Sequence, residues 1–173
     1  MRKRAAISMG LGVLFVLLSS FGQTWGQGPD HRTQYFSLGS EAFVPGSSNV
    51  EYFNTYGCGG ANIWPADTRG ALVAPVNLPH GAVITNFKVF FYDTSLNDMY
   101  VRLYIQPLED CPYVEIAQVD SSGISGYGSK QVSVDHTVDN RADSYLLYAF
   151  SESWDDNLKI KGVVITYTIK DLP

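Results

Sequence analysis

The chain has 173 residues, with 17 acidic and 12 basic side chains and a formal net charge of −5. An acidic surface repels the phosphate backbone, which argues against nucleic acid as a partner. Hydrophobic residues make up 45% of the chain and aromatic residues 13%, so the composition is that of a folded domain and excludes a disordered one.

Residues 1–26 have the three-part organisation of a secretory signal peptide. Residues 2–4 are basic, an apolar run extends from Ala5 to Leu18, and small polar residues lead to Gly26. A membrane anchor is the alternative, but about 14 apolar residues form only about 21 Å of helix, against a hydrocarbon core of about 30 Å. We predict cleavage after Gly26, or alternatively after Gly22, and a secreted chain, extracellular or periplasmic, that does not insert into a membrane.

Loss of this leader changes the charge and leaves material for one domain. The leader contains three basic residues and no acidic one, so the net charge of the mature chain falls from −5 to about −8, which also disfavours anionic lipid. The remaining length suits a single domain with its own core. We predict a flexible N-terminal arm at 27–34 and one domain at 35–173.

Alternating polarity predicts β-strands throughout this domain and no helix. In the segment 100–106 the odd positions are apolar and the even positions polar or aromatic, whereas 145–151 is apolar on both faces and indicates a central or covered strand. Turn residues separate about eight or nine such segments. This pattern predicts an all-β fold, an antiparallel two-sheet β-sandwich, with a jelly-roll-like order as first choice and an immunoglobulin-like order as second.

The last predicted strand changes phase at Gly162. Apolar residues occupy even positions up to Ile160 and odd positions from Val163 onward. Since side chains alternate with a period of two, an extra residue is needed to keep both halves facing the core. We predict a β-bulge at Gly162, or a strand that passes from one sheet to the other there.

Two cysteines, Cys58 and Cys111, remain after the leader. In an oxidising compartment the simplest expectation for such a pair is a disulfide bond, and two free thiols are the alternative. A metal site at this pair is not expected, because no histidine or further cysteine lies nearby in the sequence.

Five segments together resemble a family of uncharacterised secreted bacterial β-sandwich domains. That family has an APV-x-LP-x-GA turn followed by a strand ending in YYYDN-S, and Thr94 stands here where the family often has Asn. The resemblance covers most of the chain and implies an exported bacterial β-sandwich, but no established activity. The matching segments are Ala42–Pro45, Leu72–Ala82, Val89–Ser95, Val138–Asn140 and Gly162–Thr168.

No pattern predicts a catalytic residue. A Gly-x-Ser-x-Gly elbow is absent from the sequence, and the three histidines, His31, His80 and His136, lack the spacing of a transition-metal site. His136 shares its parity with three valines, so we expect it to be partly buried and hydrogen-bonded.

Oxygen-bearing residues gather in one predicted turn. Asp93, Asn97 and Asp98 offer the ligand type that Ca²⁺ prefers, without the ordered spacing of an EF-hand loop. A solvated turn is the simpler interpretation, so Ca²⁺ is a weak candidate and no other cofactor is expected.

Exposed aromatic residues carry the functional hypotheses. Trp64 and Trp154 fall in predicted loops, while Tyr100, Arg102 and Tyr104 share the outward face of one strand. Our first hypothesis is a non-enzymatic module for protein binding or self-assembly at or outside the cell surface, because Tyr and Arg are enriched at interface cores. The alternative is a carbohydrate-binding module that stacks aromatic rings on sugars. A secreted hydrolase using paired carboxylates is the third possibility.

Overall fold

The computed structural model describes residues 31–55, 59–64 and 68–170. The predicted signal peptide, residues 27–30 of the predicted arm, and Cys58 lie outside these ranges. Among the described residues, no helix has the length and apolar character needed to cross a membrane.

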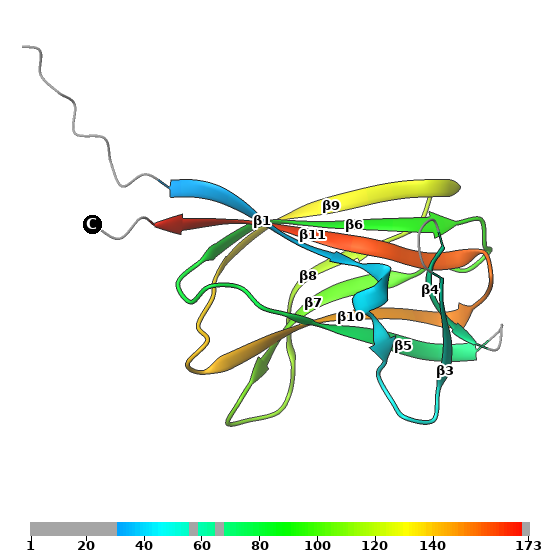
Figure 1. Cartoon of the computed structure of the whole chain (residues 1–173), viewed down its shortest axis with the longest axis horizontal. Helices are drawn as coiled ribbons and strands as arrows, with labels where there is room; N and C mark the ends of the chain where they lie inside the picture. The colour runs from blue at the N-terminus through cyan, green and yellow to red at the C-terminus, as the bar shows by residue number, and fades with distance from the viewer. Residues whose placement is uncertain (1–30, 56–58, 65–67, 171–173) are drawn as a thin grey trace, which may run out of the picture.

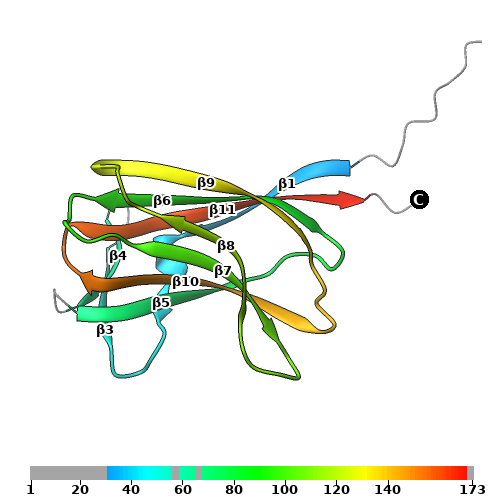
Figure 2. The same ribbon diagram turned by 180° about the vertical axis from the view of Figure 1, so that it is seen from behind.

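The described chain folds into two antiparallel sheets that pack face to face (Figures 1 and 2). The first sheet has the order β3-β4-β11-β6-β9, with β1 also paired to β11, and the second has the order β2-β5-β10-β7-β8. The elements are β1 (His31–Gly39), a 3₁₀ turn η1 (Ser40–Ala42), β2 (Val44–Pro45), β3 (Glu51–Thr55), β4 (Gly60–Trp64), β5 (Thr68–Val76), β6 (Val83–Asp93), β7 (Tyr100–Pro107), β8 (Val114–Asp120), β9 (Gly126–Thr137), β10 (Asp143–Trp154) and β11 (Leu158–Lys170).

The eight strands from β4 to β11 have the connectivity of a jelly roll. The chain passes from one sheet to the other at every connection except the β7–β8 hairpin, which gives the orders β4-β11-β6-β9 and β5-β10-β7-β8. Two interlocked Greek keys produce these orders. The predicted all-β, antiparallel, two-sheet sandwich is therefore confirmed, and the jelly-roll order is the one adopted.

The core fills the space between the two sheets and follows the period-two pattern of the strands. Val101 and Leu103 of β7 face inward and are fully buried, as the alternation in 100–106 predicts. The predicted central strand is also confirmed, because β10 lies between β5 and β7. The largest fully buried side chains of the core are Trp154, Phe43, Phe87, Phe91, Ile63, Leu72, Ile84, Met99, Leu103, Leu147, Leu158 and Ile160.

The predicted irregularity at Gly162 is confirmed. The pairing of β11 with β6 shifts register between Ile160 and Gly162, so Ile160 and Val163 are both buried. A Cβ atom at Gly162 would lie 2.6 Å from the Leu38 carbonyl oxygen of β1. Gly162 therefore permits both the bulge and the close approach of β1 to β11.

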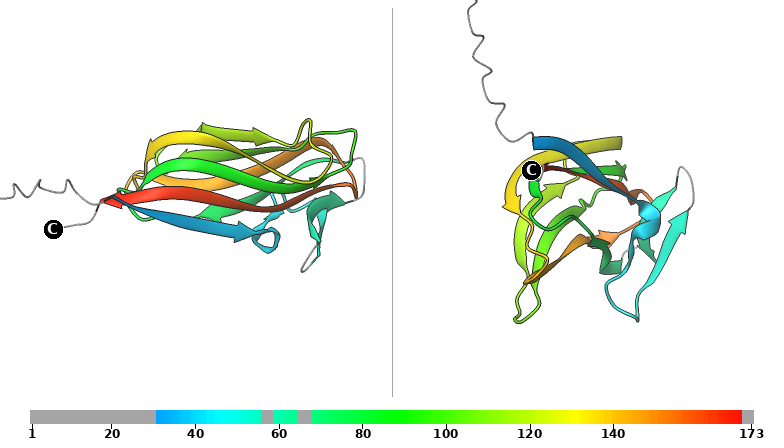
Figure 3. Two further views of the ribbon diagram at one scale, coloured as in Figure 1. Left: turned by 90° about the horizontal axis from the view of Figure 1, so that it is seen from above. Right: turned by 60° about the vertical axis from the view of Figure 1, so that its left-hand side comes forward.

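The first strand begins earlier than the sequence indicated. β1 starts at His31 and pairs with β11 along its whole length, from His31 opposite Lys170 to Gly39 opposite Gly162. The domain thus includes 31–34, where the sequence predicts a flexible arm. Figure 3 shows β1 and β11 side by side, with both described ends of the chain at one end of the sandwich.

Candidate functional site

The outward side chains of β7 meet those of β10 on the outer face of the second sheet. In the register of the two strands, Arg102 lies opposite Tyr148, Tyr104 opposite Leu146, and Tyr100 opposite Phe150. Directly opposed residues of antiparallel strands place their side chains on the same face, close enough for contact. The predicted group Tyr100, Arg102 and Tyr104 is therefore brought together there with residues of β10.

Four rings form a continuous row on this surface, which we call the aromatic face: Tyr113, Tyr104, Tyr148 and Phe150. The Tyr104 ring lies 5.8 Å from that of Tyr113 and 5.9 Å from that of Tyr148 between centroids, and the Tyr148 and Phe150 rings stack at 6.2 Å with an interplanar angle of 18°. These separations are typical of favourable aromatic pairs. The rings consequently hold one another in place as a platform.

Arg102 organises the polar part of the aromatic face. Its Nε donates a 2.7 Å hydrogen bond to Oε1 of Gln118, its Nη1 donates a 3.0 Å bond to the Tyr104 hydroxyl, and its Nε lies 3.3 Å from Oε2 of Glu115. The hydrogen bond to Tyr104 raises the pKa of the Arg102 guanidinium above its usual value. Each of the three partners keeps further hydrogen-bonding capacity for a ligand.

A second ion pair lies at the Phe150 end of the row of rings. The guanidinium carbon of Arg69 lies 5.3 Å from the centre of the Phe150 ring, and Nε of the same side chain lies 3.2 Å from Oε2 of Glu152. Arg69 and Glu152 are both largely exposed. At this end of the aromatic face, the positive charge of Arg69 is therefore offset by the negative charge of Glu152.

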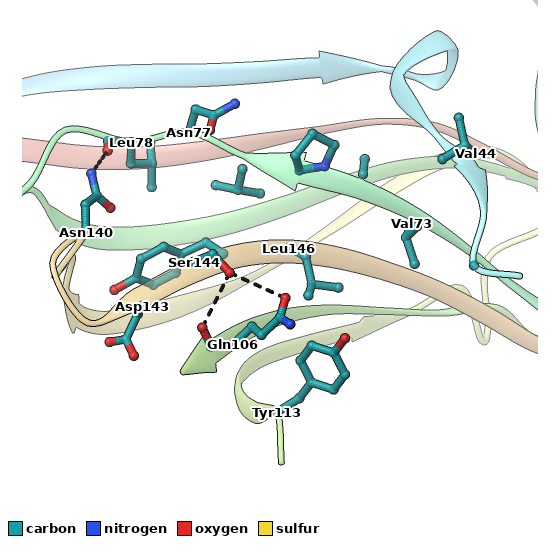
Figure 4. Close-up of a pocket in the computed structure, with 15 residues that line it drawn as sticks. Val44, Val73, Asn77, Leu78, Gln106, Tyr113, Asn140, Asp143, Ser144 and Leu146 are labelled. Atoms are coloured by element: carbon teal, nitrogen blue, oxygen red, sulfur yellow. Dashed lines mark hydrogen bonds between the residues drawn. The ribbon is translucent and has the colours of Figure 1, made fainter. Parts of the chain in front are cut away.

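The aromatic face borders a groove formed by two adjoining hollows. One, of about 490 Å³, is lined by Tyr104, Arg102 and Tyr148, and the other, of about 650 Å³, lies toward the start of β10. In Figure 4, Tyr113 lies on one side of the larger hollow and Val73 on the other, with Leu146 between them. The residues that line both hollows are Gly46, Val73, Tyr113 and Leu146.

Amide, hydroxyl and carboxylate groups line the far end of the groove. Asn140 Nδ2 donates a 2.8 Å hydrogen bond to the Leu78 carbonyl, which fixes the direction of the amide, and the Ser144 hydroxyl contacts the side-chain oxygen of Gln106 at 3.4 Å (Figure 4). The Asp143 carboxylate belongs to the same lining. The groove thus joins an aromatic half to a half rich in hydrogen-bonding groups.

The structure corrects the placement of one predicted ligand platform. Trp154 is fully buried, and its Nε1 donates a 2.9 Å hydrogen bond to the Gly70 carbonyl. The pairing of β10 with β5 shifts register between Ser151 and Trp154, so that both side chains turn inward although three positions separate them. Trp154 belongs to the core and offers no surface to a ligand.

Trp64 is the last residue of β4, and its side chain lies outside what the structure describes. Its predicted role as a platform stays a prediction.

The predicted Cys58–Cys111 bond is not found. Cys111 carries a free, exposed thiol in the loop between β7 and β8, and Cys58 lies outside the described residues. A disulfide requires that the two Cα atoms lie within about 7 Å of each other. The sequence does not show this distance, so it cannot by itself establish that two cysteines are bonded.

The turn after β6 uses its oxygen atoms within the protein. Asp93 is buried and its Oδ1 accepts a 3.0 Å hydrogen bond from the backbone of Ser95, whose hydroxyl in turn accepts one from the backbone of Asn97. The Asp98 carbonyl accepts a bond from Ser151. Within the described ranges, no three His, Cys, Asp or Glu side chains form a group able to hold a metal ion. Ca²⁺ binding at Asp93, Asn97 and Asp98 stays an untested expectation.

The expectation for His136 is confirmed. It is half-buried, and its Nε2 lies 3.1 Å from the Tyr145 hydroxyl, which also accepts a bond from the backbone of Asp139. Burial lowers the pKa of His136 and raises that of Tyr145. Tyr145 belongs to the core and also lines the larger hollow of the groove, whereas His136 is outside that lining.

Sequence reasoning missed Tyr113, Tyr148 and Phe150 as surface residues. The signal for the last two was present, because a strand that is apolar on both faces must present one face outward when it lies inside a two-layer sandwich. Tyr113 lies in a loop between strands, where no periodicity places a side chain.

No protein-family model matches the sequence, and no curated protein matches it. Among solved structures, the chain is similar to the C-terminal CBM6 of LamC, a laminarinase of Zobellia galactanivorans, with 14% identity over 77% of this chain and 99% of that one, and a TM-score of 0.45. It is also similar to the CBM36-1 domain of a xylanase from the hindgut metagenome of Trinervitermes trinervoides, with 13% identity over 76% and 96% of the two chains and a TM-score of 0.47. A third similar structure is a family 29 carbohydrate-binding module, with 14% identity over 78% and 89% and a TM-score of 0.48.

Proposed function

We propose that this chain is a non-enzymatic carbohydrate-binding module whose aromatic face and groove bind a segment of a neutral glycan. The observation that carries the proposal is the row of rings Tyr113, Tyr104, Tyr148 and Phe150, set beside the hydrogen-bonding side chains around Arg102 and along a groove.

The chemistry of this surface matches the two-sided chemistry of a sugar ring. One side of a sugar presents C–H groups, which pack on an aromatic ring, while its hydroxyls project around the edge and need donors and acceptors. Here the rings of Tyr104 and Tyr148 supply the apolar contact, and Arg102, Gln118 and Glu115 lie directly beside them. Rings with polar groups at their edges suit this ligand better than a purely apolar one.

The shape of the site favours a chain of sugars over a single one. Each of the two hollows, at about 490 and 650 Å³, falls within the range of about 300–1,000 Å³ for small-molecule sites. Because they share Val73, Tyr113 and Leu146, a ligand can run from the aromatic half into the half lined by Gln106 and Asp143. A linear oligosaccharide has the necessary length and a polar group at each residue.

The charges of the groove select against acidic glycans. Of the described residues that line the two hollows, Arg102 carries the one positive charge, and Glu115 already pairs with it. Asp143 adds a negative charge at the far end. A uronic acid would therefore meet no unpaired cation there, and we expect a neutral glycan to bind more tightly.

Protein binding by the same surface, our first hypothesis from the sequence, receives support from its Tyr and Arg content. However, the centre of a protein interface is depleted in charged residues, and this face carries the ion pairs Arg102–Glu115 and Arg69–Glu152. Carbohydrate binding is the hypothesis that uses both the rings and the charges.

Titration calorimetry tests the proposal. The protein is titrated with neutral hexasaccharides of β-1,4-glucan, β-1,3-glucan, β-1,4-xylan and β-1,4-mannan, and with a hexamer of galacturonic acid as the acidic comparator. We expect at least one neutral chain to bind and Tyr148→Ala to weaken that binding about tenfold. Tyr35→Ala, which removes an exposed ring from β1 in the other sheet, is the matched control and should change nothing.

Two outcomes would overturn the proposal. One is the absence of heat with every saccharide, combined with self-association in sedimentation that Tyr148→Ala abolishes, which would establish the assembly function instead. The other is saccharide binding that Tyr148→Ala leaves unchanged, which would move the ligand to another surface.

A further inference from the structure

We propose a second sugar-binding site, on the first sheet, between the β3–β4 hairpin and the turn that joins β10 to β11. Its described residues are Phe53 of β3, Asn62 of β4, Asp156 of the turn and Lys159 of β11, with Tyr92 and Tyr127 on the neighbouring strands. None of them belongs to the aromatic face or its groove.

The side chain of Asn62 has an unused acceptor. Asn62 is 1% exposed, and its Nδ2 donates a 3.2 Å hydrogen bond to the Asp155 carbonyl, but its Oδ1 has no hydrogen-bond partner. An unpaired buried acceptor is destabilising, and native proteins contain few of them. Asn62 lines a hollow of about 460 Å³, so a ligand in this hollow lies next to a side chain with an unmade hydrogen bond.

An aromatic ring lies beside Asn62 in the same hollow. Phe53 is directly opposite Asn62 in the β3–β4 pair, so both side chains are on one face of the hairpin. Phe53 lines the hollow with Asn62 and is 54% exposed. An exposed ring beside a buried amide reproduces, with different residues, the combination found on the aromatic face.

Lys159 and Asp156 join this hollow to a second one of about 400 Å³. Both residues line both hollows, and the second is also lined by Tyr92 and Tyr127, whose ring centres are 4.9 Å apart. Tyr92 is opposite Lys159 in the β6–β11 pair. No ion pair of the described residues involves Lys159, so its ammonium is available to a ligand oxygen.

The donors and acceptors of this site identify the class of ligand. Asn62 Oδ1 and the Asp156 carboxylate need donors, whereas Lys159 needs an acceptor. An anion would satisfy Lys159 alone. Neighbouring hydroxyls of a neutral sugar both donate and accept, and their ring packs on Phe53 or Tyr127. The size of each hollow, near the lower end of the range for small-molecule sites, fits one or two sugar residues and not a long chain.

The two sites lie on different sheets of the sandwich, which makes the module bivalent. The second site is on strands of the first sheet, whereas Tyr104, Tyr148 and Phe150 of the aromatic face are on β7 and β10 of the second. A short oligosaccharide cannot contact both sites at once, whereas an insoluble glycan presents many chains. Binding to such a surface then gains from avidity without any new contact.

Calorimetry and amide NMR test this site with the neutral hexasaccharide that binds best and with the disaccharide of the same linkage. We expect two sites in the wild-type protein, and shifts at Phe53, the Asn62 side-chain amide and Lys159 when the disaccharide is added. Phe53→Ala should remove these shifts and one binding site, and Tyr148→Ala should remove only the other. Phe90→Ala, which truncates a ring that is 36% exposed on β6, is the matched control.

Lys159→Met provides a second variant that keeps the length of the side chain and removes its donor, with an expected loss of about tenfold at this site. One binding site that Tyr148→Ala abolishes, or disaccharide shifts that survive both Phe53→Ala and Lys159→Met, would overturn the second site while leaving the proposed function intact. Binding that Phe53→Ala abolishes and Tyr148→Ala does not change would overturn the aromatic face and retain the second site.

Discussion

The guanidinium of Arg102 donates a 3.0 Å hydrogen bond to the hydroxyl of Tyr104, two residues further along the same outward face of β7. The same guanidinium also holds Gln118 and Glu115 of β8. One side chain therefore holds a ring and two polar groups together on the outer face of the second sheet, and its planar shape is what allows this.

Arg102→Lys should weaken glycan binding about tenfold with little loss of stability. A lysine keeps the positive charge but cannot donate to Gln118 and Tyr104 in two fixed directions. Calorimetry with the best-binding hexasaccharide measures the effect, and Lys88→Arg, in the other sheet, is the conservative control that should have no effect. Equal affinities for Arg102→Lys and the wild type would show that charge alone matters at this position.

Trp154→Phe should lower the free energy of unfolding by about 3 kcal/mol, because it leaves a cavity in the core and an unpaired Gly70 carbonyl. Urea unfolding measures this change, and Tyr35→Phe at an exposed position of β1 should leave the midpoint where it is. The folded Trp154→Phe protein should bind the hexasaccharide as the wild type does. If Trp154→Phe loses hexasaccharide binding but keeps its stability, Trp154 is part of the ligand site and the prediction is wrong.

Gly162→Ala should destabilise the fold by about 1–3 kcal/mol, since the new Cβ atom meets the Leu38 carbonyl and must push β1 away from β11. Hydrogen exchange should report faster opening of the β1 amides before those of β10. Gly46→Ala is the control, because its Cβ atom meets no atom closer than 3.4 Å, and we expect its stability to stay within about 0.5 kcal/mol of the wild type. If the exchange rates of the β1 amides are unchanged in Gly162→Ala, the bulge does not depend on glycine.

The pH dependence of stability near neutrality should follow His136. Burial lowers its pKa in the folded protein, so the unfolded chain, with a pKa of about 6.5, takes up the proton first as the pH falls. Stability from this residue is fully present above about pH 6.5 and is lost as the pH drops through the lowered folded pKa.

Melting temperatures between about pH 7.5 and 5 measure this loss, and His136→Gln, which can still hydrogen-bond Tyr145, should flatten the curve in that window. The lowered pKa values of Asp120 and Asp139 act at lower pH, so they do not mimic the effect. If the melting temperature of His136→Gln depends on pH as that of the wild type does, the pH dependence arises from other groups.

Much of the fold could be predicted because it depends on alternation along single strands. The inward face of β7 and the bulge at Gly162 both follow from a period of two, and a glycine marks the second of them. The inward turn of Trp154 arises from a similar shift between Ser151 and Trp154, but no glycine or proline marks it. The sequence therefore placed Trp154 in a loop, whereas it is the last residue of β10 and faces the core.

The candidate site was predicted in part for a different reason. Tyr100, Arg102 and Tyr104 lie on one strand, so their common face follows from the local sequence. Their partners come from β10 and from the β7–β8 loop, and which strands become neighbours depends on the order in which a jelly roll closes. Contacts between Tyr104 and Tyr148 therefore require the topology as well as the pattern.

The antiparallel pairing of His31 with Lys170 determines how the domain responds to mechanical load. Tension applied to the two ends of the described chain pulls on His31 and Lys170, which form the terminal pair of the β1–β11 ladder. Such tension separates the two strands one residue pair at a time, instead of shearing all the pairs together. The amides of β1 would open first, while the aromatic face on the opposite sheet is still intact. A domain attached through these ends would lengthen under strain before its second sheet is disturbed.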